Sequence, residues 1–388
     1  MALNNLVGRV FCNCHNYIFI CFLLQMTKAI TYIAFIQIIM SDLSQFDPNG
    51  VGNPNNNIFG LPFSEEESLV VLLPIPWEVT VSSGAGTSRA ADHIFRASLQ
   101  VDLFDPEYND TWKSGFFMQP IEKKILLKSD YLRKEAELYI DYISKGSDVC
   151  DNKFMLKSLR EINEGGEMLN NWVYEKTKTL LSKNKLVGLI GGDHSTPLGY
   201  MKALGEKYES YGVLQIDAHC DLRVCYEELK YSHASIMYNA LTEIPQLQKL
   251  VQVGVRDFGE DEYNYIKNNS SRVVTYFDKH IKERQYEGDN WRNIANDIIS
   301  QLPEFVYLSF DIDGLDPKLC PNTGTPVAGG FEAEQIIYLF TLLVKSGRKI
   351  IGFDLNEVGV SEGSIDANIA ARILYKMCNL IVLSNRIS

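Results

Sequence analysis

Short apolar runs recur along most of the chain, and each is nearly continuous rather than alternating with polar residues. The clearest runs cover residues 68–75, 186–190, 212–216, 249–255, 272–276, 304–310 and 349–355. Runs of this kind are typical of strands buried on both faces of a parallel sheet. Helical patterns lie between many of them, for example at 159–183 and 288–301, and a weaker run at 98–103 brings the number of expected strands to eight. The pattern predicts an α/β fold, a three-layer α/β/α sandwich around a mainly parallel sheet.

The first 39 residues differ from the rest. Residues 17–39 are strongly apolar but are interrupted by Lys28. The stretch is a poor membrane span, since a span needs about 20 apolar residues with few charges. No small-x-small cleavage site of a signal peptide follows it. We favour an interpretation in which translation starts at Met40, so that residues 1–39 lie outside the fold.

The remaining sequence is expected to form an N-terminal arm at 40–64 and one folded domain at 65–388. Within that domain, the charged stretch at 120–146 predicts an inserted pair of solvated helices.

The charge and cysteine content restrict the class of protein. The formal net charge is −12, which argues against non-specific nucleic-acid binding and is compatible with a cationic small-molecule substrate. The eight cysteines show no CxxC spacing, so they indicate reduced thiols in a cytoplasmic protein.

Four of the predicted strands run directly into acidic or histidine-containing segments. The segments are GGDHS at 191–195, DAHCD at 217–221, DIDGLDP at 311–317 and NEV at 356–358. In open parallel sheets, ligands bind beyond the carboxyl ends of the strands. These polar side chains are therefore expected to share one edge of the sheet.

The spacing within these segments predicts a metal site. Side chains alternate along a strand, so Asp217, His219 and Asp221 are expected to converge, as are Asp311 and Asp313. The same alternation makes Cys220 a packing residue. The clustered carboxylates would repel one another without cations. Oxygen and nitrogen donors without a thiolate suit Mn²⁺ better than structural zinc.

A single acid pair of this kind is more often a helix cap or a solvated turn. Three clusters, each at the end of a predicted strand, favour the metal site.

GGDHS, DAHCD and SFDIDGLDP resemble the three signature motifs of the ureohydrolase family, which contains arginases, agmatinases and formimidoylglutamases. TGTPVAGG at 323–330 and VQVGVRD at 251–257 resemble family flanks, and the resemblance covers roughly residues 65–385. It implies that each subunit binds two divalent ions, with Mn²⁺ as the preferred metal and Ni²⁺ as the alternative. It also implies a homo-oligomer, either a trimer or a hexamer. The implied ligands are His194, Asp217, Asp221 and Asp311 for one ion, and His219, Asp217, Asp311 and Asp313 for the other.

The resemblance also implies a reaction. A hydroxide that bridges the two metals attacks the guanidinium carbon, and the products are urea and an amine or ammonia. Asp221 orients the hydroxide, Glu357 pairs with the guanidinium, and His233 delivers a proton to the leaving amine. The alternatives are a surface acid for Glu357 and a structural loop histidine for His233.

The substrate is less well determined. Arginases typically carry an asparagine after the DAHxD motif, whereas this chain has Leu222 and Arg223. The chain looks closer to agmatinase-like members and to longer members that hydrolyse free guanidine. Agmatine-type compounds and guanidine are both candidates, followed by formimidoylglutamate and arginine. Arg223 is expected at the mouth of the pocket, or else in a surface salt bridge with Glu227 or Glu228.

Two functions outside this class are alternatives. A non-catalytic paralogue that acts as a binding subunit would be expected to have lost a ligand, and no ligand is missing from the motifs. A deacetylase-like hydrolase with a single zinc ion would not need both His194 and the complete second set of ligands.

Overall fold

A computed structural model describes residues 43, 46–81, 84–361 and 365–386. Contacts divide the chain into two units, residues 1–47 and 48–388, and the fold described below belongs to the second. The segment 1–39, with the start expected at Met40, lies outside the described residues. Among the residues that are described, no helix has the length and apolar character needed to cross a bilayer.

Eight parallel strands form a single sheet, in the order β2-β1-β3-β8-β7-β4-β5-β6. The strands are β1 (Val70–Pro74), β2 (Phe116–Met118), β3 (Leu186–Ile190), β4 (Tyr211–Ile216), β5 (Leu247–Val253), β6 (Val273–Tyr276), β7 (Phe305–Asp311) and β8 (Lys349–Asn356). The predicted parallel sheet of eight strands is confirmed. Nearly every residue of the central strands is buried, which explains their continuous apolar runs.

The eighth strand is not the one that the sequence favoured. Residues 98–103 end helix α2 and continue as a turn, in which Val101 donates its backbone N–H to the carbonyl of Ser98. Short-range bonds of this kind leave that stretch outside the sheet. The edge position is instead taken by Phe116–Met118, which pairs in parallel register with Val70–Leu72.

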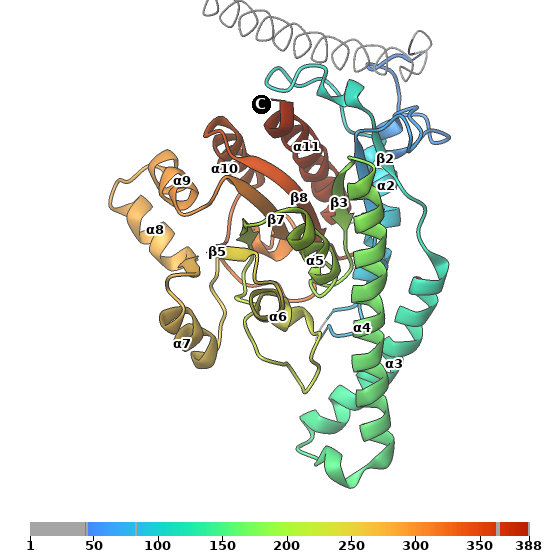
Figure 1. The fold of residues 1–388 in the computed structure, drawn as a ribbon, viewed down its shortest axis with the longest axis vertical. Helices are drawn as coiled ribbons and strands as arrows, with labels where there is room; N and C mark the ends of the chain where they lie inside the picture. Colours follow the sequence, from blue (N-terminus) through green and yellow to red (C-terminus); the bar gives the residue numbers. More distant parts are fainter. Residues whose placement is uncertain (1–42, 44–45, 82–83, 362–364, 387–388) are drawn as a thin grey trace, which may run out of the picture. The chain divides into compact units, whose positions relative to one another are not determined.

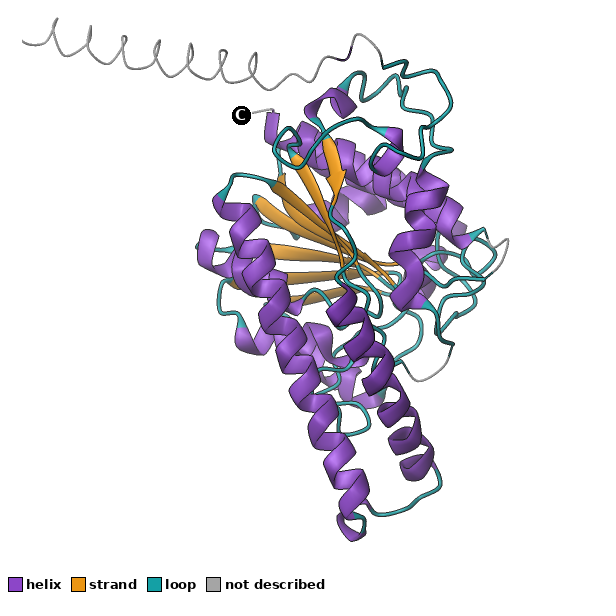
Figure 2. Ribbon diagram, turned by 90° about the vertical axis from the view of Figure 1, so that its right-hand side faces the viewer, coloured by secondary structure: helices purple, strands orange, loops and turns teal. Residues whose placement is uncertain are grey.

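Helices cover both faces of the sheet (Figures 1 and 2). Helices α2, α9, α10 and α11 pack along one face, and α4, α5 and α6 pack along the other. This three-layer arrangement was predicted. The helices are α2 (Ala90–Ser98), α3 (Lys123–Ser144), α4 (Lys153–Ser182), α5 (Leu198–Lys207), α6 (Ile236–Glu243), α7 (Glu260–Asn268), α8 (Asp278–Tyr286), α9 (Trp291–Ser300), α10 (Ala333–Lys345) and α11 (Asp366–Arg386).

The charged stretch at 120–146 forms one long helix, α3, and not the pair of helices that was expected. Its partner in an antiparallel hairpin is α4, which begins after a short connection. The Tyr131 hydroxyl donates to Glu161 across the hairpin at 3.0 Å, and the Ser158 hydroxyl donates to Glu135 at 2.7 Å. The hairpin extends well beyond the sheet (Figure 2).

Gly188 provides a test of the packing at the centre of the sheet. A Cβ atom at this position in β3 would lie 2.3 Å from the Phe353 ring and 2.8 Å from Leu72 Cδ2. We expect Gly188→Ala to destabilise the fold by about 1–3 kcal/mol, because overpacking forces neighbours out of position. The midpoint of urea unfolding measures the loss. Gly84→Ala is the matched control, since its Cβ would meet nothing closer than 3.6 Å; equal midpoints for the two variants would contradict the packing argument.

Candidate metal centre

The predicted site residues gather at one edge of the sheet. His194 follows β3, Asp217 and Asp221 follow β4, Asp311 ends β7, and Glu357 follows β8. Because β3, β8, β7 and β4 are consecutive in the sheet and run in parallel, their carboxyl ends bring these side chains to the same place.

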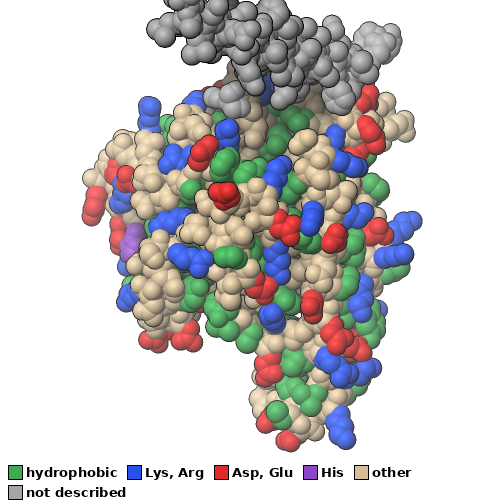
Figure 3. Space-filling model, viewed as in Figure 1, with side chains coloured by type: hydrophobic (Ala, Val, Ile, Leu, Met, Phe, Trp, Pro, Cys, Tyr) green, Lys and Arg blue, Asp and Glu red, His purple; other side chains and the backbone are tan. Residues whose placement is uncertain are grey.

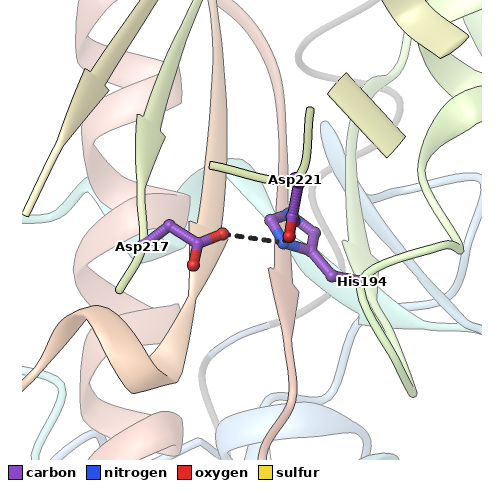
Figure 4. A group of neighbouring side chains, drawn as sticks. All are labelled: His194, Asp217 and Asp221. Carbon is purple, nitrogen blue, oxygen red and sulfur yellow. Dashed lines mark ion pairs between the residues drawn. The ribbon is translucent and has the colours of Figure 1, made fainter. Parts of the chain in front are cut away.

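His194 is at the centre of a first group. Its Nδ1 atom lies 3.0 Å from Asp217 Oδ2, 2.9 Å from Asp221 Oδ2 and 3.3 Å from Asp311 Oδ2. Figure 4 shows the carboxylates of Asp217 and Asp221, both from the loop after β4, beside the imidazole of His194. All four side chains are almost fully buried.

His219 forms a second group with Asp313 and Asp217. Its Nδ1 atom lies 3.0 Å from Asp313 Oδ2 and 3.6 Å from Asp217 Oδ1. One oxygen of Asp217 therefore faces each histidine, and Asp217 belongs to both groups. Asp311 contacts His194, while its Oδ1 atom accepts the backbone N–H of Asp313 at 2.9 Å.

The prediction that these side chains converge through strand alternation is wrong. β4 ends at Ile216, so the DAHCD segment is a loop, and Asp221 adopts a left-handed backbone with φ of 54°. Asp313 lies in a 3₁₀ turn, Ile312–Gly314. Turns, and not the pleat of the sheet, direct these carboxylates inward. Cys220 packs into the hydrophobic core, as predicted.

The electrostatics of this group favour cations. Burial alone would lower the pKa of both imidazoles, but hydrogen bonds and charges from the surrounding aspartates raise it, for His219 to about 12. Burial, and then the charge of Asp217, raises the pKa of Asp221. Nδ1 of His194 and Oδ2 of Asp221 are buried 2.9 Å from each other, and no described group outside the cluster donates to or accepts from either atom. A donor set of carboxylates and imidazoles with orphaned atoms fits two divalent cations, whose binding would displace protons.

A chain of hydrogen bonds orients His194. Its Nε2 atom lies 2.9 Å from Ser309 Oγ, and that hydroxyl donates to Asp354 Oδ1 at 3.1 Å. Because the hydroxyl proton is used on Asp354, Ser309 accepts the Nε2–H of His194. When the imidazole gives up its second proton, the lone pair is therefore on Nδ1, the atom that faces the carboxylates.

A second chain supports Asp217. Gln215 donates to Asp217 Oδ2 at 2.7 Å, Gln252 donates to Gln215 Oε1 at 2.7 Å, and Thr275 donates to Gln252 Oε1 at 2.8 Å.

Together the two chains occupy one row across five strands. Asp354, Ser309, Gln215, Gln252 and Thr275 are neighbours in register. We call this set the polar row. The polar row was not predicted from the sequence, although each member is a polar residue inside an otherwise apolar run.

Glu357 has one oxygen fixed and one available. Its backbone is left-handed, with φ of 58°, and Oε1 accepts the backbone N–H of His194 at 2.8 Å. Oε2 is buried without a hydrogen-bond partner. The alternative of a surface acid is therefore wrong.

His233 is fixed by two residues that had no predicted role. Its Nδ1 atom lies 3.3 Å from Thr80 Oγ1, and that hydroxyl lies 3.3 Å from Asp193 Oδ2. A Thr80 hydroxyl that donates to Asp193 must accept Nδ1–H of His233, which leaves Nε2 as the acceptor. Burial lowers the pKa of His233 to about 4, so its ring is neutral at pH 7.

These groups face a cavity of about 180 Å³. Its wall includes both metal-group histidines, His233, Glu357 and Arg223. The Arg223 guanidinium lies 4.9 Å from the centre of the Tyr226 ring, and its Nε atom is 3.8 Å from Glu262 Oε2. Arg223 thus lines the cavity as expected, and the alternative salt bridge with Glu227 or Glu228 is wrong: its ion pair is with Glu262 of α7.

Comparison with known proteins agrees with this geometry. A model of the arginase family matches residues 68–379. The chain belongs to the arginase family. The family membership predicted from the three motifs is confirmed, and the chain is an arginase-family ureohydrolase.

Other family members match most of the chain. An N(1)-aminopropylagmatine ureohydrolase of Thermus thermophilus is 27% identical over 81% of this chain and 91% of its own length. An agmatinase of Halalkalibacterium halodurans is 25% identical over 76% of this chain and 84% of its own. The solved structure of a proclavaminate amidino hydrolase from Streptomyces clavuligerus has the same fold, with a TM-score of 0.64 and 20% identity over 86% of this chain and 99% of its own.

The polar row predicts an effect on metal binding. We expect Ser309→Ala to weaken Mn²⁺ binding by about 10–100-fold, because the orientation of His194 is lost. Titration calorimetry with Mn²⁺ measures the change. Thr275→Val, at the far end of the row, is the control and should change affinity much less. Equal losses in the two variants would show that the row stabilises the fold without orienting a ligand.

Proposed function

We propose that this chain hydrolyses a small guanidino compound to urea and an amine or ammonia, with two divalent cations bound at the carboxyl edge of the sheet. The proposal rests on one arrangement of residues. Asp217 belongs to two histidine–carboxylate groups, and these groups lie beside a cavity lined by Glu357, whose Oε2 atom has no hydrogen-bond partner.

The six proposed ligands divide between the two ions. One ion would be held by His194, Asp217, Asp221 and Asp311, and the other by His219, Asp217, Asp311 and Asp313. Mn²⁺ suits this donor set best, with Ni²⁺ as the alternative because imidazole is among its usual ligands. When bound, the two ions would supply a water activated for attack on the guanidinium carbon.

Glu357 is suited to bind the guanidinium group. Its Oε1 atom is held by the backbone of His194, so the position of Oε2 in the cavity wall is fixed. A carboxylate at this place can accept N–H donors from the planar cation. Asp221, in the loop after β4, also lines the cavity and is suited to accept a hydrogen bond from the attacking water.

His233 is suited to move a proton to the leaving amine. The chain from Asp193 through Thr80 holds the proton on Nδ1 and leaves Nε2 free to accept one. A neutral imidazole can take up a proton and pass it to the leaving nitrogen.

The cavity favours substrates without an amino-acid head group. Arg223 has no acceptor for an ammonium group and repels cationic tails. Glu262 and Asp257, two carboxylates that also line the cavity, offset that charge away from the immediate surroundings of Arg223. We therefore propose free guanidine or an agmatine-type compound as the substrate, ahead of formimidoylglutamate and arginine.

The two metal groups predict different effects of two substitutions. Asp217→Ala should remove both ions and abolish activity, because Asp217 belongs to both groups. His194→Ala should mainly weaken one site, so that about one ion per subunit remains. Elemental analysis after dialysis measures the metal content. A full complement of metal in Asp217→Ala would exclude the shared-ligand assignment.

Selectivity tests the role of Arg223. We expect arginine to have a kcat/KM at least about tenfold below the best substrate, or roughly 1.4 kcal/mol of discrimination. Arg223→Asn should raise the kcat/KM of agmatine and arginine relative to that of guanidine. Urea release from each compound, with Mn²⁺ and with Ni²⁺, gives these values, and Arg372→Asn on α11 is a matched control outside the cavity.

Two outcomes separate the parts of the proposal. Efficient arginine turnover by the unmodified protein would contradict the selectivity argument and leave the hydrolytic function intact. Failure of every guanidino compound to release urea with either metal would contradict the hydrolytic function and favour a binding subunit.

A further inference from the structure

Arg256 is a basic residue beside the metal centre to which the proposed function assigns no role. It follows β5, in the VQVGVRD segment at 251–257, and is partly buried. On the face of the molecule in Figure 3, lysine and arginine side chains lie among acidic ones, and several form ion pairs, as Arg89 does with Asp130 at 2.9 Å. The Arg256 guanidinium instead donates to backbone carbonyl oxygens. A charged side chain bound to the main chain fixes the position of those segments.

The guanidinium binds the turn that carries Asp313. Its Nη2 atom lies 2.6 Å from the carbonyl oxygen of Asp313 and 3.0 Å from that of Leu315, and its Nη1 atom lies 3.4 Å from that of Gly314. Nη1 also donates to the carbonyl of Gly254 at 3.1 Å, directly after β5. Successive carbonyls of the turn are therefore tied to the end of β5 by one planar group.

The same guanidinium holds the loop at 323–330. Nε and Nη2 both donate to the carbonyl of Val327, at 3.2 and 3.0 Å. Gly329 of this loop has φ of 106°, and a Cβ atom there would lie 3.2 Å from Arg256 Cδ, so the loop passes close to the arginine. From the same loop, the Thr325 hydroxyl donates to Asp313 Oδ2 at 3.4 Å. The loop that Arg256 holds thus reaches the carboxylate of Asp313.

The backbone of Arg256 is joined to the loop after β4. Its N–H donates to the carbonyl of Ala218 at 2.8 Å, as does the N–H of Asp257 at 3.1 Å. His219 forms a parallel bridge with Asp257. The segment that carries His219 is therefore anchored to the same residue as the turn that carries Asp313.

These contacts determine how Asp313 faces His219. Oδ1 of Asp313 accepts the N–H of Ala218 at 3.0 Å, and Oδ2 lies 3.0 Å from His219 Nδ1. Because Asp313 and His219 come from different loops, their separation depends on what joins the loops, and Arg256 contacts both. His194, at the centre of the first group, is oriented from inside the sheet by the polar row. A change at Arg256 should therefore affect the second group far more than the first.

We infer that Arg256 is a positioning residue for the second ion, the one that His219 and Asp313 would hold. The guanidinium suits this task because its N–H donors lie in one rigid plane and reach carbonyls of several segments at once. A lysine has the same charge but a single nitrogen atom, so it cannot hold β5, the turn and the loop at 323–330 together. The inference rests on the two-metal part of the proposed function.

Mn²⁺ binding to Arg256→Lys tests the inference. In titration calorimetry on metal-free protein, we expect the second ion to bind about 10–100-fold more weakly than in the unmodified protein, because the support of two ligands is lost. The first ion should bind as before. Asp313→Ala, which removes a ligand of the second ion, identifies the binding step that must weaken. At Mn²⁺ concentrations that fill only the first site of Arg256→Lys, electron paramagnetic resonance should show isolated Mn²⁺ where the unmodified protein shows a coupled pair.

Arg272→Lys is the matched control. The Arg272 guanidinium also donates to backbone carbonyls, those of Leu241 at 3.2 Å and Leu247 at 2.7 Å, but Arg272 directly precedes β6, at the amino edge of the sheet. It should lower the midpoint of urea unfolding of the metal-free protein and leave both Mn²⁺ affinities unchanged. Equal weakening of both ions in Arg256→Lys, or the same weakening in Arg272→Lys, would show a general loss of stability and overturn the inference.

Thr325→Val provides a second test if Arg256→Lys does not fold. It removes the hydroxyl that joins the loop at 323–330 to Asp313, so the second ion should bind about tenfold more weakly and the first should not. Unchanged binding of the second ion in Arg256→Lys, or in Thr325→Val where Arg256→Lys does not fold, would overturn the inference and leave the two-metal proposal intact. Fewer than two Mn²⁺ ions bound by the unmodified protein would contradict both.

Discussion

Mutual repulsion among Asp217, Asp221, Asp311 and Asp313 is the constraint on which the rest of the structure depends. These carboxylates are buried against one another, and burial makes their charges more costly than they would be in water. Two imidazoles offset part of the charge in the metal-free chain. Two divalent cations would offset more, and the cluster is arranged so that Asp217 can serve both of them.

The fold holds this cluster in place in two ways. The polar row fixes the imidazole of His194 and the carboxylate of Asp217 from inside the sheet, where every amide and hydroxyl must find a partner. Left-handed backbone at Asp221 and Glu357 turns these acids inward at the ends of their strands. Non-glycine residues in that conformation cost roughly 1–3 kcal/mol each and persist only where the surroundings hold them. The left-handed backbone at these two residues therefore lowers the stability of the fold, at the positions where the acidic side chains must converge.

The outer wall of the cavity is formed by the loop after β4 and by α7, outside the strands whose ends carry the metal cluster. The Arg223 guanidinium lies over the Tyr226 ring and pairs with Glu262, so the charge at the mouth depends on two segments, the loop after β4 and α7. The α3–α4 hairpin extends beyond the sheet (Figure 2) and takes no part in the cavity wall. Substrate choice can therefore vary independently of the metal cluster.

The sequence alone determined the sheet, its parallel direction, the family and the residues of the cluster, because continuous apolar runs and the GGDHS, DAHCD and DIDGLDP segments are local patterns. It misplaced the eighth strand, since a three-residue edge strand such as Phe116–Met118 carries almost no periodic signal. It could not find the polar row, Thr80 or Glu262, because each acts through a partner distant in the chain. Only the tertiary structure decided that turns aim the carboxylates inward and that Arg223 pairs with Glu262. Such contacts depend on how strands and loops pack, and local sequence does not encode that packing.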